Sequence, residues 1–455
     1  MVDSPRRPTP KALTAQFRAR TGLEPPQESK IYRCAKKSPV SAIPEYAPMG
    51  GVLIAYPGTV APGLNEEQRA PSGPRSFGIP NELIVRMQQN ETEHPVHIFV
   101  MCEDLNQFDV IVGDLHHTAT ELELSFDPEK LHMVPWDTDT FWTRDYGPWW
   151  VYNDATQNFG IVKHSYTTLG GGSVGLVEGA ESVPPTEGLG IFRPNDDYGA
   201  VKLSDLLDAP VRAWNGARWP GGKKNEPIDT HDWFFLGLLD VGGNYMVTGT
   251  GVLASSYLVA TQNEIPVGSE DELTKPDQKE LDERMTYILE QMNRFMGVHT
   301  YHVLADPTGT YIGHIDCWGK FLADDKVLIA RSEHKAIDKH FDAISDSFVA
   351  EGFTVYRVMC QDIYVSSANP PATTAAYTNS LILNDHVYVP IAGKGHEERD
   401  TQALAAYKEA LPDHTIVGIV GKPEFPWLGT DAMHCRTRGI PRKVVSNWLA
   451  AQPGG

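Results

Sequence analysis

Short β-branched runs alternate with helical patterns along most of this 455-residue chain, and this rhythm constrains the fold more than any other feature. From Gly51 onward, turn residues bound the apolar runs, as is typical of strands. Strands are predicted at 52–55, 97–100, 327–330, 354–358, 386–389 and 415–419. Helices are predicted at 81–89, 277–296, 335–351 and 401–411, two of which stop at the C-cap glycines Gly297 and Gly352. The alternation predicts an α/β architecture, in which strand pairs between helices indicate small repeated units without a strict sequence repeat.

Two stretches interrupt this rhythm. Residues 1–43 are rich in proline and charge, and we expect them to form an N-terminal extension to one domain at 44–447. Residues 164–200 break the rhythm, and three consecutive glycines and a Pro/Glu/Gly-rich stretch up to Gly190 predict a long loop there, either functional or a disordered insertion. Gly242-Gly243-Asn244 is too short for a phosphate-binding loop and predicts a bulge or a tight turn.

Charge and hydropathy limit the partners and the location of the chain. A net charge of −20 argues against nucleic acid, which needs a basic face. The charge suits cationic substrates, although solubility alone also explains it. No apolar run is long enough for a membrane helix, and the polar N-terminus lacks the apolar centre of a signal peptide. We expect no membrane partner and a cytoplasmic location by default, or a secreted one if the chain is a trimmed mature form; homo-oligomerisation stays open.

The cysteines do not form a structural framework. They number five, an odd count, and they are widely spread, so no disulfide pattern is implied. No Cys-x-x-Cys pair exists to indicate a zinc ribbon, and we expect neither a metal nor a cofactor.

One cysteine nevertheless stands in a segment that favours reactivity. Cys435 lies between His434 and Arg436, in a turn-like stretch between Gly429 and Gly439. Cationic neighbours lower the pKa of a thiol, and only the thiolate is a good nucleophile. The alternative is that Cys435 is a small buried hydrophobic residue, which is the commoner role of a lone cysteine.

Two further motifs carry charged groups. His314 and Asp316 are two residues apart, and on a strand this spacing puts both side chains on one face. Asp145 lies in the stretch Trp142-Thr143-Arg144-Asp145-Tyr146-Gly147-Pro148. Each motif alone also fits a surface pair or a turn held by an ion pair. Together, a cysteine, a histidine and two carboxylates far apart in sequence predict a nucleophilic enzyme that acts on a cationic group.

Taken in order, these motifs resemble those of the guanidino-group-modifying enzymes. The resemblance is closest to the Porphyromonas-type peptidylarginine deiminase family, whose sister branch is agmatine deiminase. It spans roughly residues 44–445 and is carried by the segments at 44–52, 142–148, 193–197, 242–244, 314–316, 377–380 and 434–437. The family fold is a pseudo-fivefold α/β propeller of ββαβ units, called pentein-like, with the active site on its axis.

The resemblance also implies a mechanism. Asp145 and Asp316 would grip the planar guanidinium of the substrate in bidentate fashion. Cys435 would attack the guanidinium carbon to form a covalent thiouronium intermediate. His314 would protonate the departing ammonia and then deprotonate the hydrolytic water, while Asn379 would orient the cysteine or the intermediate.

Other residues fit two roles each. Trp142 and Trp149 would either wall the substrate or serve as core aromatics. Asp240 would be either a substrate contact or a residue of a turn at the end of a strand. Cys317 adjoins Asp316 and is expected to pack rather than to act as a second nucleophile.

Selectivity within the family depends on the segment before Pro194. Family members that bind a C-terminal arginine clamp its carboxylate with two arginines; here Arg193 stands at the second position, but Ile191 stands at the first. Residues 430–433 lack the glycine run of agmatine deiminases. We therefore expect an arginine deiminase acting on peptidyl, most often C-terminal, arginine. The alternatives are an agmatine deiminase that yields N-carbamoylputrescine, a non-catalytic binding protein on the same fold, and a cysteine hydrolase of another class, such as an amidase.

Overall fold

The fold is described from a computed structural model of the 455-residue chain. The structure describes residues 30–57, 77–90, 94–166, 194–207, 234–259, 278–307, 313–333, 335–360, 376–421, 427 and 431–452. Arg193, Ile191 and most of the loop predicted at 164–190 lie outside these residues.

The described residues form five small sheets that share one plan. In each sheet an antiparallel strand pair is followed by a parallel strand that a helix connects. The simplest sheet contains β12 (Gly319–Ala323), β13 (Lys326–Arg331) and β14 (Thr354–Met359), with α8 (Lys335–Ala350) between the last two. The next contains β15 (Leu381–Leu383), β16 (His386–Ile391) and β17 (Thr415–Val420), with α9 (Glu397–Ala410).

The other three sheets add a fourth strand to this plan. One has the order β1 (Lys30–Arg33), β11 (Thr300–Leu304), β10 (Val252–Ser256) and β9 (Met246–Val247), with α7 (Gln278–Met296). Another has β2 (Val40–Ala42), β6 (Trp149–Asn153), β7 (Asn158–Ser165) and β8 (Phe234–Leu239), with α5 (Pro194–Leu207). The last has β18 (Arg438–Pro441), β3 (Met49–Ala55), β4 (His97–Met101) and β5 (Leu131–Val134), with α2 (Asn81–Gln88) and α3 (Gln107–Glu121).

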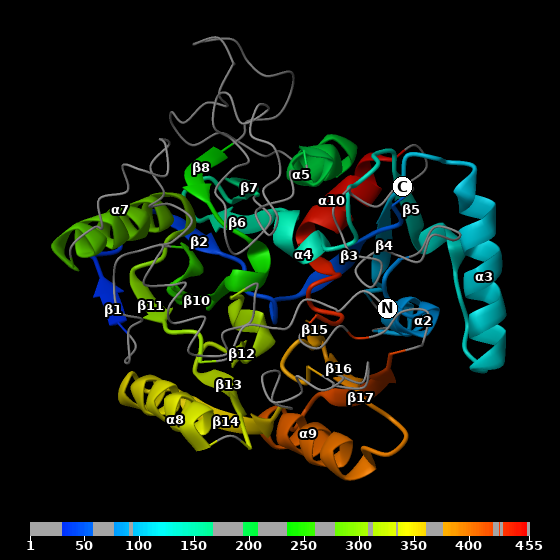
Figure 1. The fold of residues 1–455 in the computed structure, drawn as a ribbon. Coiled ribbons are helices and arrows are strands. Elements are labelled where there is room, and N and C mark those ends of the chain that lie inside the picture. Colours follow the sequence, from blue (N-terminus) through cyan, green and yellow to red (C-terminus); the bar gives the residue numbers. More distant parts are fainter. Residues whose placement is uncertain are drawn as a thin grey trace, which may run out of the picture.

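Pairing between distant segments closes the fold. The C-terminal strand β18 pairs antiparallel with β3, so that Gly439 faces Val52. The helix α10 (Arg442–Ala451) follows β18 and packs on β3. The sheets lie around the middle of the molecule, with α7, α8, α9 and α3 on the outside (Figure 1). Residues from remote parts of the chain can therefore meet near the centre.

The predicted α/β architecture is confirmed, and every predicted strand and helix is present with boundaries shifted by a few residues. The structure adds α3 and α10, which the sequence analysis did not assign. The helix α5 begins at Pro194, after the loop predicted up to Gly190, whereas the predicted start of that loop overlaps β7, which runs to Ser165. Residues 30–42, within the predicted N-terminal extension, contribute β1 and β2, which pair with β11 and β6.

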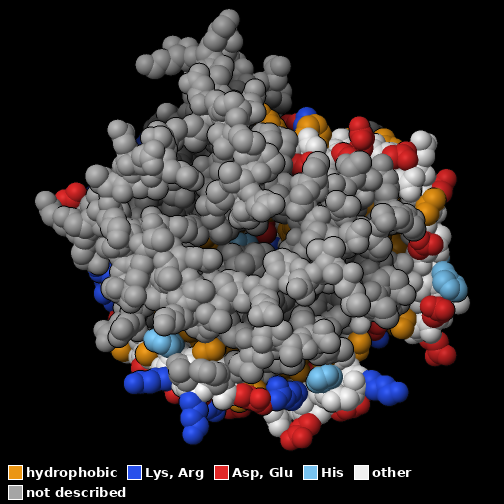
Figure 2. Space-filling model, viewed as in Figure 1, with side chains coloured by type: hydrophobic (Ala, Val, Ile, Leu, Met, Phe, Trp, Pro, Cys, Tyr) orange, Lys and Arg blue, Asp and Glu red, His pale blue; other side chains and the backbone are white. Residues whose placement is uncertain are grey.

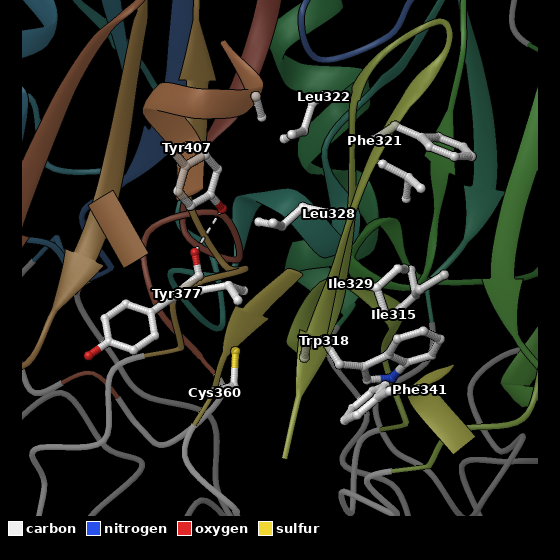
Figure 3. Packing of buried hydrophobic residues seen from close by; sticks show 14 of the residues in the cluster. Ile315, Trp318, Phe321, Leu322, Leu328, Ile329, Phe341, Cys360, Tyr377 and Tyr407 are labelled. Carbon is white, nitrogen blue, oxygen red and sulfur yellow. Dashed lines mark hydrogen bonds between the residues drawn. The ribbon is translucent and has the colours of Figure 1, made fainter. Parts of the chain in front are cut away.

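Acidic and basic side chains are unevenly distributed on the surface. In the view of Figure 2, acidic side chains are frequent on the side where α3 lies, and basic ones gather near α8 and α9. Among the described residues, no helix is long and apolar enough to cross a membrane. One large core cluster joins the β12–β14 and β15–β17 sheets, where Trp318, Phe341 and Tyr407 are buried (Figure 3).

Candidate active site

Cys435 lies in a tight turn immediately before β18, and Asn379 holds this turn in place. The Asn379 side-chain oxygen accepts hydrogen bonds from the backbone nitrogens of Ala432, at 3.0 Å, and Cys435, at 3.1 Å. Its amide nitrogen donates to Sγ of Cys435 at 3.1 Å. Both Cys435 and Asn379 are buried. One side chain thus fixes both the backbone and the sulfur of the turn.

His314 and Asp316 belong to a second tight turn. The two residues do not lie on a strand, the case for which their spacing was considered, because residues Ile315–Cys317 form the 3₁₀ helix η5 and His314 precedes it. Gly313 before them has a φ of 65°, which glycine adopts without strain. Ile315 and Trp318 anchor the turn by pointing into the core (Figure 3). The apolar neighbours of the turn therefore position its two polar side chains.

Asp316 connects this turn to the cysteine turn. The thiol of Cys435 donates to Oδ2 of Asp316 at 3.4 Å, and Nδ1 of His434 lies 2.8 Å from the same oxygen. Cys317 lies on the other side of the carboxylate, with its sulfur 3.8 Å from Oδ1, and it packs in the core cluster as predicted.

Asp145 and His314 approach each other around a glycine. Asp145, in the short helix α4 (Thr143–Tyr146), accepts a hydrogen bond from the backbone nitrogen of Gly243 at 3.1 Å. Its Oδ1 lies 3.9 Å from Nδ1 of His314. A Cβ added at Gly243 would lie 2.7 Å from His314 Nδ1, 2.8 Å from Asp145 Oδ1 and 3.1 Å from Asp316 Oδ2. Gly243 therefore marks the point where these three side chains converge.

Gly243, His434 and Glu45 are site residues whose roles the sequence analysis missed. Gly243 lies in the 3₁₀ helix η3 (Gly242–Asn244), for which we predicted only a bulge or turn. The Glu45 side chain is only 13% exposed, and its Oε2 lies 2.6 Å from Nε2 of His434. No spacing rule connects Glu45 with His434, because they are 389 positions apart and meet only through the pairing of β3 with β18.

Glu45 is the centre of a buried ion-pair network behind the cysteine. Its Oε1 lies 2.9 Å from Nζ of Lys320, and its Oε2 lies 3.2 Å from NH2 of Arg144. Burial alone would raise the pKa of Glu45, but its three basic neighbours hold that pKa well below its usual range. Arg144 also fastens the cysteine turn, since its Nε donates to the carbonyl of His434 at 3.1 Å.

The expectation that cationic neighbours lower the pKa of Cys435 is wrong for the free protein. Burial raises the pKa of the Cys435 thiol well above its ordinary value, and the nearby carboxylates of Asp316, Asp431 and Asp145 raise it further. Arg436 is turned away and forms two contacts with Asp431, at 2.8 and 3.1 Å. The thiol is therefore neutral in a site without a bound cation.

The pKa values of His314 and Asp316 are both lowered, which leaves the imidazole neutral and the carboxyl ionised. Burial lowers the pKa of His314, so the imidazole is neutral near pH 7. Burial alone would raise the pKa of Asp316, but the hydrogen bond from His434 leads the effects that hold this pKa below its usual value. The site therefore combines a carboxylate, a neutral thiol and a neutral imidazole.

The predicted substrate-contacting residues lie in different places. Trp142 is partly exposed, and its indole nitrogen donates to Asp431 at 2.8 Å, beside the cysteine turn. Trp149 is a buried core aromatic that stacks on Tyr245 with ring centroids 4.1 Å apart. Asp240 is buried and accepts from the backbone nitrogen of Val241 at 2.8 Å, and burial raises its pKa to about 8. No hydrogen bond or ion pair among the described residues joins Asp240 to the cysteine turn.

The side chains suit nucleophilic chemistry on a cation. The described residues contain no group of three or more His, Cys, Asp or Glu side chains placed to hold a metal ion. Instead, carboxylates and a thiol converge on one point, where a positively charged group would be stabilised.

Comparisons with known proteins show which families the chain resembles. Residues 271–441 match the family model described as Porphyromonas-type peptidyl-arginine deiminase. A segment of 69 residues is 33% identical to a Marinomonas sp. (strain MWYL1) protein named "Putative agmatine deiminase" and covers 15% of this chain and 17% of that protein. A Vibrio parahaemolyticus protein of the same name is 34% identical over 68 residues, covering 15% of this chain and 18% of that protein. The chain thus matches less than a fifth of the length of either relative.

Solved structures extend the likeness over nearly the whole chain. The agmatine deiminase of Enterococcus faecalis aligns with a TM-score of 0.54 and 18% identity, covering 90% of this chain and 99% of that one. A Porphyromonas gingivalis structure named "Putative Arginine Deiminase" aligns with a TM-score of 0.54 and 18% identity, covering 88% and 98%. At these identities the structural likeness shows the fold alone. Residues 271–441 thus resemble the Porphyromonas-type peptidyl-arginine deiminase family, and nearly the whole chain shares the fold of solved arginine and agmatine deiminases.

Proposed function

We propose that this protein is a hydrolase that converts the guanidinium group of its substrate to a ureido group and ammonia. One observation carries the proposal: the Cys435 thiol contacts both Asp316 and Asn379, at the point where Asp145 and His314 also converge. An amidase would not need two carboxylates around its reacting carbon. A binding protein would not need a thiol held by two hydrogen bonds at that position.

The carboxylates bind the cation and activate the nucleophile indirectly. A planar guanidinium donates in parallel pairs, so Asp145 and Asp316 can each accept from a different edge. The bound positive charge also offsets the carboxylates that raise the pKa of the Cys435 thiol. The substrate itself thus supplies the cation that favours the thiolate, and the neutral imidazole of His314 takes the thiol proton.

The two halves of the reaction then balance. Sulfur bonds to the guanidinium carbon, and the carbon–nitrogen bond breaks as His314 returns the proton to the leaving ammonia. In the second half, neutral His314 removes a proton from water, whose oxygen bonds to the carbon as the sulfur leaves and takes up that proton. The proton that remains on the ureido oxygen carries the positive charge of the original guanidinium, and it is released to solvent, where ammonia takes it up as ammonium. Asn379 orients the sulfur throughout. The neutral ureido product no longer pairs with the two carboxylates, which favours its release.

We propose that peptidyl arginine with a free C-terminus is the preferred substrate, through Arg193 as a carboxylate partner. Two observations on the neighbouring carboxylates support this. Asp197 already pairs with the buried Lys163 at 2.5 Å, and Asp196 accepts from the side chain of Thr140 at 2.7 Å. A structural ion pair with Arg193 is therefore not needed to satisfy these acidic groups. The candidate second function is agmatine deimination, favoured by the curated relatives with that name.

One assay decides between these functions. Ammonia release is measured on benzoyl-arginine, its C-terminal amide, free arginine, agmatine and glutamine, in the parent protein and in Arg193→Ala. We expect the amide to bind more weakly than benzoyl-arginine in the parent protein, and this difference to shrink in the variant. Preferred turnover of agmatine would replace the peptidyl proposal, turnover of glutamine alone would indicate an amidase, and no turnover at all would indicate a binding protein.

The fold supports a finer proposal about architecture. We infer that the five sheets are the five ββαβ units of a pseudo-fivefold propeller of the pentein type, with residues 44–447 as the catalytic domain. The common strand plan of the sheets supports this, as does the closing pair between β18 and β3.

A further inference from the structure

A pocket, called the rear pocket below, lies beside the cysteine turn. Its free space, counted together with the adjoining open solvent, is about 470 Å³, and its lining includes Asp316 and His434 but not Cys435, Asn379 or His314. The Asp316–His434 pair is therefore a wall shared by this rear pocket and the candidate active site.

The polar end of the rear pocket carries more positive than negative charge. Its cations are Arg144, Lys320 and Arg438, and its carboxylates are Glu45 and Asp316. Even with His434 counted as neutral, the cations exceed the carboxylates by one. Glu45 already pairs with both Lys320 and Arg144. Arg438 is therefore the cation in this pocket whose charge no carboxylate balances.

Arg438 is a fixed and buried guanidinium without a carboxylate partner among the described residues. Its Nε donates to the carbonyl of Pro148 at 2.8 Å. Its aliphatic stem packs against Gly147, where an added Cβ would come within 2.9 Å of the Arg438 Cγ atom. Burial and the nearby Arg144 lower the pKa of Arg438 to about 9. A buried, unpaired cation is costly, and an anion in the pocket would offset that cost.

The rest of the lining defines the shape of such an anion. Ile43, Met246, Ile315 and Phe321 supply apolar walls. A fully hydrated ion would leave these walls facing water, whereas a short hydrocarbon tail would cover them. We propose that the rear pocket binds a small monocarboxylate, with its acid group at Arg438 and Arg144 and its apolar tail beside Met246. Around Cys435 in the candidate active site, the carboxylates of Asp145, Asp316 and Asp431 disfavour an anion.

A titration with propionate tests the proposal without reference to turnover. The protein is labelled with ¹³C at its methionine methyl groups, and propionate is added at constant pH and ionic strength while the methyl spectrum is recorded. We expect a saturable shift of the Met246 resonance, with the other methionines far less affected. Propionamide, which has the same shape but no charge, should not shift it.

Variants identify the residue that binds the acid group. Arg438→Gln should weaken propionate binding by about 10-fold or more, since a charge-assisted hydrogen bond to the ligand is removed. Arg331→Gln changes an exposed arginine that pairs with Asp338 and should leave binding unchanged. Arg193→Gln should also leave it unchanged, which separates this site from the proposed substrate clamp.

Three results would overturn the proposal. They are a Met246 shift that does not saturate, an equal response to propionamide, and propionate affinity that survives in Arg438→Gln. If Arg438→Gln does not fold, the comparison of propionate with propionamide in the parent protein still shows whether the pocket selects an anion. Loss of binding in Arg193→Gln instead of Arg438→Gln would move the anion to the candidate active site.

Discussion

The Nε2 atom of His434 lies 2.6 Å from Oε2 of Glu45, so the residue beside Cys435 is tied to a carboxylate from the N-terminal part of the chain. Through its other ring nitrogen, His434 reaches Asp316. A continuous polar chain thus runs from the Cys435 thiol to the ion-pair network around Glu45. This network stabilises the site and makes its geometry dependent on the charge of Glu45.

Glu45→Gln should destabilise the protein by about 3 kcal/mol at pH 7, because it leaves Lys320 and Arg144 buried without their shared anion. The folded-state pKa of Glu45 lies well below that of the unfolded chain, so its contribution is complete above about pH 4.3 and is lost as the pH falls further. Urea unfolding at pH 7 and at pH 3.5 measures both effects.

Glu409→Gln, on the exposed face of α9, is the matched control and should leave the free energy of unfolding nearly unchanged. If Glu45→Gln unfolds like the parent protein at pH 7, the ion pairs of Glu45 contribute nothing net to stability.

Cys435 should discriminate between reagents by charge. The free thiol is neutral, and its acidic surroundings attract a cation that favours the thiolate, so 2-chloroacetamidine should inactivate the protein at least about 10-fold faster than 2-chloroacetamide. Mass spectrometry of the modified peptide identifies the site, and Cys435→Ala should lose both labelling and turnover while remaining folded. Cys34, which lies outside the site, supplies the intrinsic reactivity ratio of the two reagents. The same ratio at both cysteines would contradict the acidic-site explanation.

Substitutions of the carboxylates and of the histidine should change different kinetic parameters. Asp145→Asn and Asp316→Asn each remove a charge from the guanidinium grip, which costs about 2–5 kcal/mol in kcat/KM. His314→Ala should lower kcat far more than it raises KM, because the imidazole transfers protons rather than binding substrate. Steady-state kinetics over a range of pH test this. Near-normal kcat in His314→Ala at every pH would remove its acid–base role.

Gly243→Ala should reduce turnover by about 100-fold or more, because the new methyl would displace side chains of the candidate active site. Its carbon would lie within 3.1 Å of atoms of His314, Asp145 and Asp316. Gly113→Ala is the matched control, since its Cβ would meet nothing within 4 Å on α3, and the change should stabilise the helix by about 1 kcal/mol. Parent-like kinetics in Gly243→Ala would show that the three side chains do not act from the observed positions.

The sequence predicted the fold class and the main helices and strands because their apolar patterns are local. It also predicted that Cys435, His314, Asp316 and Asp145 would come together, through motifs that resemble those of one family. It could not show the direction in which His434 and Arg436 point, and the predicted effect on the thiol pKa was therefore wrong. Glu45 was missed for a similar reason, because its partners come from three other segments and no local pattern signals a buried ion-pair network.

His302 should make the protein sensitive to acid. It is buried in β11, stacked on Phe348 with ring centroids 4.7 Å apart, and neither ring nitrogen has a hydrogen-bond partner among the described residues. Burial lowers its pKa to about 4, below the unfolded value of about 6.5. The neutral form therefore contributes stability that is complete above pH 6.5 and lost as the pH falls toward 4, by about 3 kcal/mol in all.

His302→Phe keeps an aromatic ring in the stack but cannot be protonated, so its free energy of unfolding should fall less between pH 6.5 and pH 4 than that of the parent protein. Urea titrations at both pH values measure this difference. His340→Gln, which removes an exposed histidine, should keep the slope of the parent protein. Overpacking by the phenyl ring would lower the stability at every pH alike, so it cannot imitate a change of slope. An unchanged slope in His302→Phe would mean that another group causes the acid sensitivity.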